Sequence, residues 1–270
     1  MAENRRRRGR FSETALAVLL AGAAACGVVR AATPPDAAKT PILLELFTSE
    51  GCSSCPPVDV WAERLDAAQP IAGAEIIVLS EHVNYWDHDG WKDPFSSDQL
   101  TARQRGYEQI LGIGDAYTPQ VILNGAEEVR VANSAAQIRQ TFEKAATAPM
   151  LAVKIESAAV DDGALTGRVA VDATSEKHGG DVFVAVTLDR TQTDVLAGEN
   201  DGKKLTNVAV VRNLVKVGKL EKGKSFEAPF TVKLWPGADP ANLRVVAFVQ
   251  GSDLGKVLGA GMTKDIAKGN

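Results

Sequence analysis

The apolar run Ile42-Leu43-Leu44-Glu45-Leu46-Phe47 and the motif Cys52-Ser53-Ser54-Cys55-Pro56-Pro57 stand close together, and a stretch rich in helix formers follows them. This order predicts a buried strand, a tight turn and a helix. Two cysteines three positions apart can close a disulfide. A thiolate in such a turn is favoured by the positive end of the next helix. The stretch therefore favours a redox-active dithiol at the carboxyl end of a strand.

Two other interpretations of the cysteine pair stay open at this point. One is a structural disulfide, and the other is half of a zinc site, although the sequence has no second Cys-x-x-Cys. Pro56 disfavours helical geometry at Cys55. We therefore expect the helix to begin at Pro56, with Cys55 as its cap and Cys52 in the turn ahead of it.

Residues 1–31 have the order of a secretory signal. Arginines cluster between Arg5 and Arg10, an apolar segment of 15 residues runs from Ala15 to Val29, and a small-x-small site ends at Ala31. A membrane-spanning helix needs about 20 residues, which disfavours an uncleaved anchor. Cys26 raises lipid attachment as an alternative. The sequence thus predicts a periplasmic or secreted protein, with residues 32–40 as a linker and no stable membrane span after cleavage.

Removal of residues 1–31 would take away six arginines and two glutamates, which changes the formal net charge from −4 to −8. No basic patch remains, so we expect no nucleic-acid partner. Cys52 and Cys55 become the only cysteines of the mature chain, in a compartment where disulfides persist. They must pair with each other or with a partner's thiol.

The first half of the chain alternates strand and helix patterns, whereas the second half is made of strands alone. The patterns predict strands at 42–48 and 75–82, helices at 56–68 and up to 111, a hairpin through Asn124-Gly125, and a helix from Ser134 to 146. From Met150 onward, apolar residues recur at period two, as in a small sandwich. We expect two domains, at 41–148 and 150–265.

The first-half order, with Thr118-Pro119 opening the hairpin, resembles the thioredoxin fold. The chain also resembles a family of secreted bacterial proteins of unknown function, thioredoxin-like with an appended β domain, over about residues 41–265. That resemblance rests on the motifs at 47–57, 82–87, 91–95, 101–104, 118–120 and 198–202. It implies an α/β thioredoxin-like domain followed by an all-β sandwich-like domain.

The resemblance to thioredoxins also implies roles for individual residues. Cys52 would be the exposed nucleophile, and Cys55 would be the resolving thiol that releases the mixed disulfide. Thr118 and Pro119 would form the wall on the substrate side, where the family has a cis proline. The alternative for Pro119 is a trans proline at the start of an edge strand.

The segment between the second strand and the next helix is rich in aromatic and acidic residues. His82, Tyr85, Trp86 and Trp91 lie in it. Because it follows a strand, it emerges at the same edge as Cys52 and is placed to arch over the dithiol and bind a substrate. The alternative is a loop that packs its aromatic rings onto the body of the protein.

Three functions are consistent with these features. The leading hypothesis is an exported thiol-disulfide oxidoreductase without a cofactor, which acts on protein or small-molecule thiols. The second is a non-enzymatic binding module of the cell envelope. The third is copper or zinc handling by Cys52, Cys55 and either His82 or His88.

We expect Arg103 and Arg105 to lie on the solvated face of their helix. We expect Gly198–Gly202 to be a turn with Glu199 and Asp201 exposed, and the family resemblance makes it a candidate contact between the domains.

Overall fold

The computed structural model describes residues 39–172 and 179–269. The expected signal sequence, with Cys26, and nearly all of the linker lie outside the described residues. The described residues belong to one compact unit. Within the described ranges, no helix is both long enough and apolar enough to cross a bilayer.

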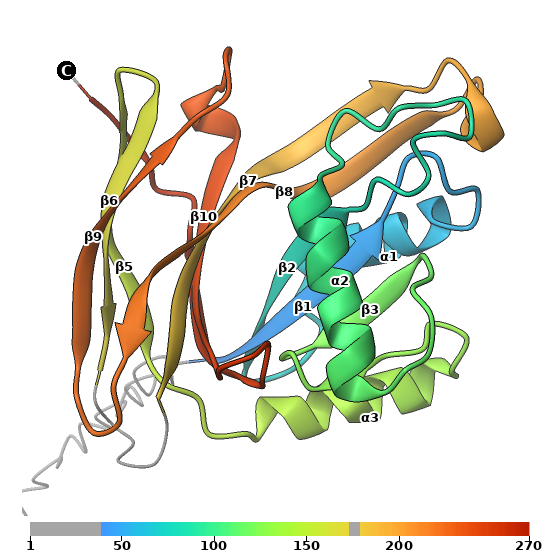
Figure 1. Cartoon of the computed structure of the whole chain (residues 1–270). Helices are drawn as coiled ribbons and strands as arrows, with labels where there is room; N and C mark the ends of the chain where they lie inside the picture. The colour runs from blue at the N-terminus through green and yellow to red at the C-terminus, as the bar shows by residue number, and fades with distance from the viewer. Residues whose placement is uncertain (1–38, 173–178, 270) are drawn as a thin grey trace, which may run out of the picture. The chain divides into compact units, whose positions relative to one another are not determined.

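The first half of this unit alternates strands and helices in the expected order (Figure 1). The helix after the cysteines begins at Pro56 and the hairpin turns through Asn124 and Gly125, both with positive φ, as predicted. Cys55 itself has helical dihedral angles, so the expected effect of Pro56 on its geometry is wrong; that effect is a bias and not a prohibition. The elements are β1 (Thr40–Thr48), α1 (Pro56–Ala68), β2 (Ala74–His82), α2 (Asp98–Leu111), β3 (Gln120–Leu123), β4 (Glu127–Glu128) and α3 (Ala135–Ala146).

Strand β1 is buried on both faces, and its side chains alternate between two helical layers. Ile42, Leu44 and Leu46 pack with α1 and α3, whereas Leu43 and Phe47 pack in clusters with residues of α2. This is the period of two that a strand imposes on its side chains. Helices thus cover both faces of the strand, which places the turn after β1 at the edge of a rigid core.

The second half consists of strands and two short 3₁₀ helices. The two longest strands, β7 and β8, form a hairpin that reaches back toward the first half (Figure 1). The elements are β5 (Val153–Asp161), β6 (Ala164–Val171), β7 (Gly180–Asp194), η1 (Gly198–Asn200), β8 (Lys204–Leu220), β9 (Phe226–Lys233), η2 (Pro240–Asn242), β10 (Leu243–Gln250), β11 (Val257–Thr263) and β12 (Ala267–Lys268).

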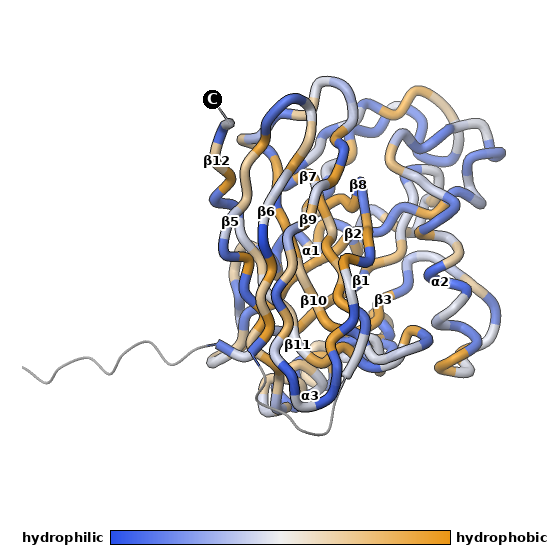
Figure 2. The backbone as a smooth tube through the Cα atoms, turned by 60° about the vertical axis from the view of Figure 1, so that its left-hand side comes forward, coloured by the Kyte–Doolittle hydropathy of each residue, from blue (hydrophilic) through white to orange (hydrophobic). Residues whose placement is uncertain are grey.

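Strands from both halves share one large sheet. Its order is β11-β10-β7-β8-β2-β1-β3-β4, and a second sheet has the order β12-β5-β6-β9. The two halves meet where β8 runs parallel to β2, through the single residue pair Ser80 and Val210. An apolar core, visible as hydrophobic stretches of the central strands in Figure 2, lies between the second sheet and strands β7 and β10. The thioredoxin-like and sandwich-like assignments, and the division into two domains, stay predictions.

Arg103 is buried at the centre of a polar network, so the expectation that it is solvated is wrong. Its Nε donates to Glu45 of β1 at 2.5 Å, and its Nη2 donates to Tyr107 and to Gln250 of β10, each at 3.0 Å. Glu81 of β2 lies 3.6 Å from the same Nε. Burial, and then the charge of Glu45, hold the pKa of Glu81 well above its usual range. One cation thus faces one carboxylate and one carboxyl group that favours its neutral form.

A second buried arginine joins α1 to the β-rich half. Arg244 of β10 donates two hydrogen bonds to the carboxylate of Asp66, at 2.6 and 3.0 Å, and its Nε donates to Asp189 of β7 at 3.0 Å. Such two-point pairing fixes the orientation of both partners. The helix that begins after Cys55 is therefore anchored at its far end to the second half of the chain.

We predict that Arg103→Leu lowers the free energy of unfolding by about 3 to 5 kcal/mol, because it leaves the carboxylate of Glu45 buried without its partner. Arg105→Leu is the matched control, since Arg105 is an exposed arginine of the same helix, and it should change stability by less than about 0.5 kcal/mol. Urea unfolding of both variants provides the measurement. Equal effects of the two substitutions would show that the buried network is not what stabilises this region.

Candidate functional site

The site is the turn between β1 and α1, residues 49–55, which we call the cysteine turn. Backbone hydrogen bonds fold it tightly: the N–H of Cys52 donates to Ser49, and the N–H of Cys55 donates to Cys52. Cys52 and Cys55 form a disulfide with their Cα atoms 5.5 Å apart. Cys55 directly precedes the first residue of α1, so the sulfur pair stands at the positive end of a helix, where a thiolate is favoured.

Both cysteines are fully buried, so the expectation of an exposed Cys52 is wrong for this structure. Their exposed fractions are 0%, although Ser53 and Ser54 between them are exposed. The sulfur atoms therefore lie just beneath the surface without reaching it. The expectation came from the resemblance to thioredoxins. It is wrong because residues from distant parts of the chain pack against the cysteine turn.

Thr118 reaches the disulfide from the loop before β3. Its carbonyl oxygen lies 3.8 Å from Sγ of Cys52, and the hydroxyl of Ser54 lies 3.3 Å from the same sulfur. The peptide bond between Thr118 and Pro119 is cis. Nε1 of Trp86 donates to the Thr118 hydroxyl at 2.8 Å. The structure thus brings together Cys52, Thr118, Pro119 and Trp86, which the sequence analysis had placed in one site.

The segment that joins β7 to β8, residues 195–203, clamps the cysteine turn. We call it the β7–β8 turn. The side-chain amide of Asn200, which is fully buried, donates to the carbonyl oxygens of Glu50 at 2.8 Å and Cys52 at 3.0 Å. Glu199 accepts a hydrogen bond from the N–H of Ser53 at 2.9 Å, and this contact helps to lower the pKa of Glu199. The second half of the chain therefore contacts the peptide units on either side of the Gly51–Cys52 peptide bond.

The aromatic loop, residues 83–97, holds the cysteine turn from another side. Nε1 of Trp91 donates to the carboxylate of Glu50 at 3.0 Å, and Asp93 accepts from the N–H of Glu50 at 2.8 Å. A side chain on Gly51 would meet Cβ of Trp86 at 3.0 Å. Tyr85 packs beside Trp86, with ring centroids 6.3 Å apart. The loop thus packs onto the body of the protein, and it does so at the disulfide.

His82 lies at the end of β2 and is fully buried. Its Nδ1 is 2.7 Å from Asp93, and its ring contacts the ring of Phe95 edge-on. Burial lowers the pKa of His82, but the charge and hydrogen bond of Asp93 outweigh this and raise the pKa overall. For Asp93, burial is likewise outweighed by His82, and its pKa is lowered. Both shifts favour the charged forms of the pair, which holds the aromatic loop in place, and His82 has no exposed surface.

Asp59 is a buried acid that the sequence analysis missed. It lies in α1 one turn after Cys55, on the inward face, and accepts a hydrogen bond from Thr48 at 2.7 Å. Burial raises its pKa to about 7, against weaker opposing effects of Thr48 and His82. The signal in the sequence was its spacing, since residues four apart share one face of a helix. A proton at Asp59 is thus held or released near neutral pH within one helical turn of Cys55.

The side chains that the metal-handling hypothesis requires do not lie together. Among the residues that the structure describes, no group of three or more His, Cys, Asp or Glu side chains is placed to hold a metal ion. His82 is engaged by Asp93, and His88 has a 75% exposed side chain beside Asp89. A third donor for Cys52 and Cys55 is therefore not positioned by these two histidines.

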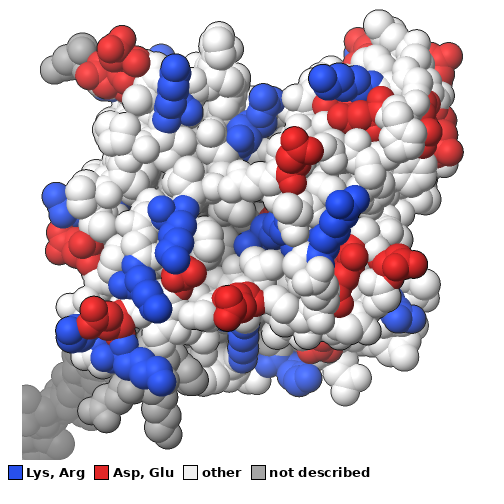
Figure 3. Space-filling model, in the orientation of Figure 1, with Lys and Arg blue, Asp and Glu red and all other residues white. Residues whose placement is uncertain are grey.

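Several exposed acids lie at the end of the molecule that carries the site. On the face shown in Figure 3, red side chains gather where the aromatic loop and the β7–β8 turn lie, with basic side chains among them. The exposed acids of these two segments are Asp89, Glu199 and Asp201, and their exposed lysines are Lys92 and Lys203. Sequence analysis identified Glu199 and Asp201 as exposed residues of a contact turn, but it gave no role to Asn200, which makes the central contact.

Fold and site together define a class of mixed α/β protein in which one Cys-x-x-Cys disulfide closes the turn after a central strand. A family model described as a protein of unknown function, DUF1223, matches residues 43–250. The chain belongs to this family. The resemblance to a family of unknown function is therefore confirmed, while its thioredoxin-like character stays a prediction. A search of the curated proteins found no match.

Solved structures extend the comparison. The chain is similar to a crystal structure of a protein from Agrobacterium tumefaciens, with 27% identity and a TM-score of 0.61, over 83% of this chain and 94% of that one. A sporulation control protein from Bacillus subtilis matches 45% of this chain and 49% of its own, with 13% identity and a TM-score of 0.31. A likeness as weak as the second says nothing about fold or function here.

We predict that Asp59→Asn flattens the pH dependence of stability between about pH 4 and pH 7. The folded state holds a proton on Asp59 up to a pKa of about 7, whereas the pKa of an unperturbed aspartate is 3.8. The wild-type free energy of unfolding should therefore fall as pH rises through this window. Urea unfolding at several pH values measures the slope, with the exposed Asp201→Asn as control. An unchanged slope in Asp59→Asn would contradict the assignment.

Proposed function

We propose that the protein is a thiol-disulfide oxidoreductase in which the β7–β8 turn controls access to the Cys52–Cys55 disulfide. The observation that carries the proposal is the position of Cys52, whose sulfur lies against the Thr118 carbonyl and directly beneath exposed Ser53 and Ser54. This position leaves a short exposed segment between the sulfur and an incoming thiol.

The reaction is an exchange at Cys52. An external thiolate attacks Sγ of Cys52, the bond to Cys55 breaks, and a mixed disulfide forms while Cys55 leaves as a thiolate. A second thiol of the substrate then attacks the mixed disulfide and releases Cys52. The substrate dithiol loses two electrons and two protons and becomes a disulfide, and the two cysteines gain them as thiols. The same steps run backward when the protein acts as a reductant.

Exchange requires the closed structure to open, because the attacking thiolate must touch a sulfur that now has no exposed surface. The clamp is made of a few hydrogen bonds from Asn200 and Glu199, at the tip of a long hairpin. Each such bond contributes about 0.5 to 1.5 kcal/mol. Release of the tip therefore costs far less than global unfolding, which is about 5 to 15 kcal/mol for ordinary domains.

The proposal includes a thioredoxin-like first half and export to the periplasm or medium. The order β-α-β-α-β-β-α with the dithiol after the first strand supports the first point. The secretory order of residues 1–31 supports the second point. The disulfide supports it too, because disulfides persist outside the reducing cytosol. Protein or small-molecule thiols are the proposed substrates, and Thr118, Pro119 and Trp86 are the proposed substrate-side residues.

Full burial of both sulfurs favours a second candidate, a non-enzymatic binding module. In that case the disulfide would staple the cysteine turn, and the aromatic loop with the β7–β8 turn would form the surface that contacts an envelope partner. The two candidates differ in one property. The disulfide of the oxidoreductase exchanges in the folded protein, whereas that of the binding module exchanges only when the protein unfolds.

We predict that Asn200→Ala accelerates reduction of Cys52–Cys55 by dithiothreitol about tenfold or more. The substitution removes two hydrogen bonds from the clamp, or about 2 kcal/mol, and a tenfold change in an equilibrium corresponds to about 1.4 kcal/mol. Asp201→Ala, in the next and exposed residue, should leave the rate unchanged. Alkylation of free thiols followed by mass spectrometry measures the rate in the absence of denaturant. If both variants and the wild type are reduced only at the rate of global unfolding, the disulfide is structural and the binding module is favoured.

We predict that Cys52→Ser lowers the oxidation of a dithiol peptide, with glutathione disulfide as the terminal oxidant, to the uncatalysed rate. Cys55→Ser, mixed with the disulfide form of the same peptide, should instead trap the peptide on Cys52: the Cys52 thiolate attacks the peptide disulfide, one peptide sulfur leaves as a thiolate, and Cys55 is absent to release the mixed disulfide. The trapped species is detected as an added mass that dithiothreitol removes. Turnover that is unchanged in Cys52→Ser would exclude the proposed reaction.

A further inference from the structure

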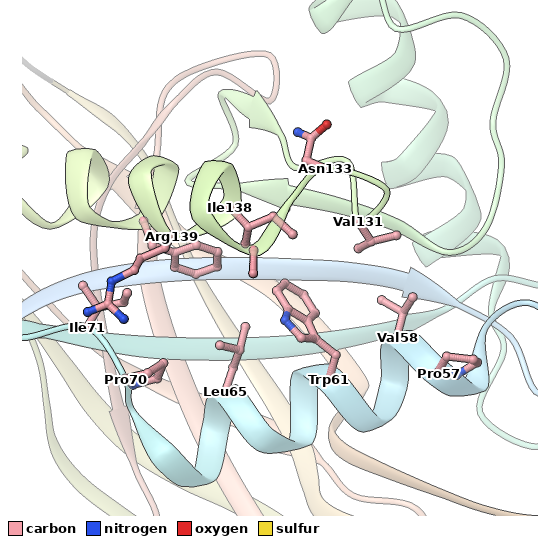
Figure 4. Close-up of a pocket in the computed structure, with 12 residues that line it drawn as sticks. Pro57, Val58, Trp61, Leu65, Pro70, Ile71, Val131, Asn133, Ile138 and Arg139 are labelled. Carbon is pink, nitrogen blue, oxygen red and sulfur yellow. The ribbon is translucent and has the colours of Figure 1, made fainter.

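A cavity lies between α1 and α3, away from the cysteine turn. Its volume is about 580 Å³, within the range of about 300 to 1,000 Å³ that small-molecule sites occupy. Its walls are mainly apolar, with Trp61, Leu65 and Ile138 prominent among them (Figure 4). The proposed exchange reaction makes no use of this cavity.

The residues that line the cavity are spread along the axis of α1 (Figure 4). Pro57 and Leu65 both line it, and eight residues of helix span about 12 Å. Pro57 and Val131 lie at one end in Figure 4, Pro70 and Ile71 lie at the other, and Trp61 lies between them. A trough of this form matches an extended hydrocarbon chain better than a compact ring.

Charge is present at one end only. Among the described residues that line the cavity, Arg139 is the only charged one, and Figure 4 places its guanidinium beside Ile71. The Nε of Arg139 donates to Glu143 at 2.8 Å, in a pair whose side chains are 61% and 54% exposed. Such exposed pairs are weak, and the terminal nitrogens of the guanidinium remain able to donate to an anion.

We infer that the cavity between α1 and α3 binds a free fatty acid, with the acyl chain along α1 and the carboxylate on Arg139. The apolar trough removes the chain from water, which is the main source of affinity. The single cation at the Ile71 end selects a carboxylate over a neutral head group and sets the direction of the chain. Its apolar end then points toward Pro57, two residues after Cys55.

The experiment is titration calorimetry with dodecanoate below its micelle-forming concentration. Wild-type protein should bind one equivalent with a Kd on the order of 0.1 to 1 mM, because burial of a fourteen-carbon chain alone provides about 0.1 mM and dodecanoate is two methylenes shorter. Val131→Asp places a charge in the lining at the Pro57 end and should weaken binding at least tenfold. The side chain of Val131 is already 38% exposed. Leu196→Asp is the control, since Leu196 is a 76% exposed apolar residue outside the cavity, and it should bind as the wild type does.

The head group is tested with Arg139→Gln and dodecanol. The substitution should weaken dodecanoate binding about fivefold to tenfold and leave dodecanol binding unchanged, because only the carboxylate uses the guanidinium. Absence of saturable dodecanoate binding, or equal losses in Val131→Asp and Leu196→Asp, would overturn the site. Equal dodecanoate binding in Arg139→Gln and wild type would overturn the placement of the carboxylate. None of these readouts involves the cysteines, so they are independent of the proposed exchange reaction.

Discussion

The buried guanidinium of Arg103 is the constraint on which the arrangement of the two halves depends. It is held by Glu45 of β1, Tyr107 of its own helix and Gln250 of β10, and Phe248 of β10 lies beneath it at 5.5 Å. These partners are far apart in the sequence. A buried charge is tolerated only when its partners are fixed around it, so α2, β1 and β10 can pack together in few other ways. The single backbone pair between β2 and β8 would not impose this by itself.

The cover over the disulfide follows from this arrangement. Because β7 and β8 belong to the same sheet as β1, their connecting turn arrives at the end of the sheet where the cysteine turn lies. Asn200 then donates to two backbone carbonyls of the tight turn, those of Glu50 and Cys52. The aromatic loop completes the enclosure through Trp91 and Asp93. Hydrogen bonding rather than apolar packing thus fixes the position of the cover.

Sequence patterns predicted the parts of this structure that local physics decides. The apolar run of β1, the proline start of α1 and the Asn124-Gly125 hairpin are each specified within a few residues. Arg103 was misplaced because a buried arginine on a helix has the same spacing as a solvated one. The exposure of Cys52 was wrong because segments distant in the sequence enclose its turn: Thr118 lies against its sulfur, and Asn200 contacts its carbonyl from 148 residues away. The sequence pattern that predicts a turn at 198–202 contains no information about what the turn touches.

The contact of Asn200 with the backbone of Cys52 has a thermodynamic corollary. If opening of the β7–β8 turn favours reduction of the disulfide, then reduction must favour opening by the same free energy, because coupling between two equilibria is reciprocal. Any molecule that binds the tip of this hairpin would consequently shift the reduction potential of the Cys52–Cys55 disulfide. The oxidation state of the two cysteines would in turn alter the affinity for that molecule. The redox state of the disulfide in the first half of the chain thus affects binding at the surface of the second half.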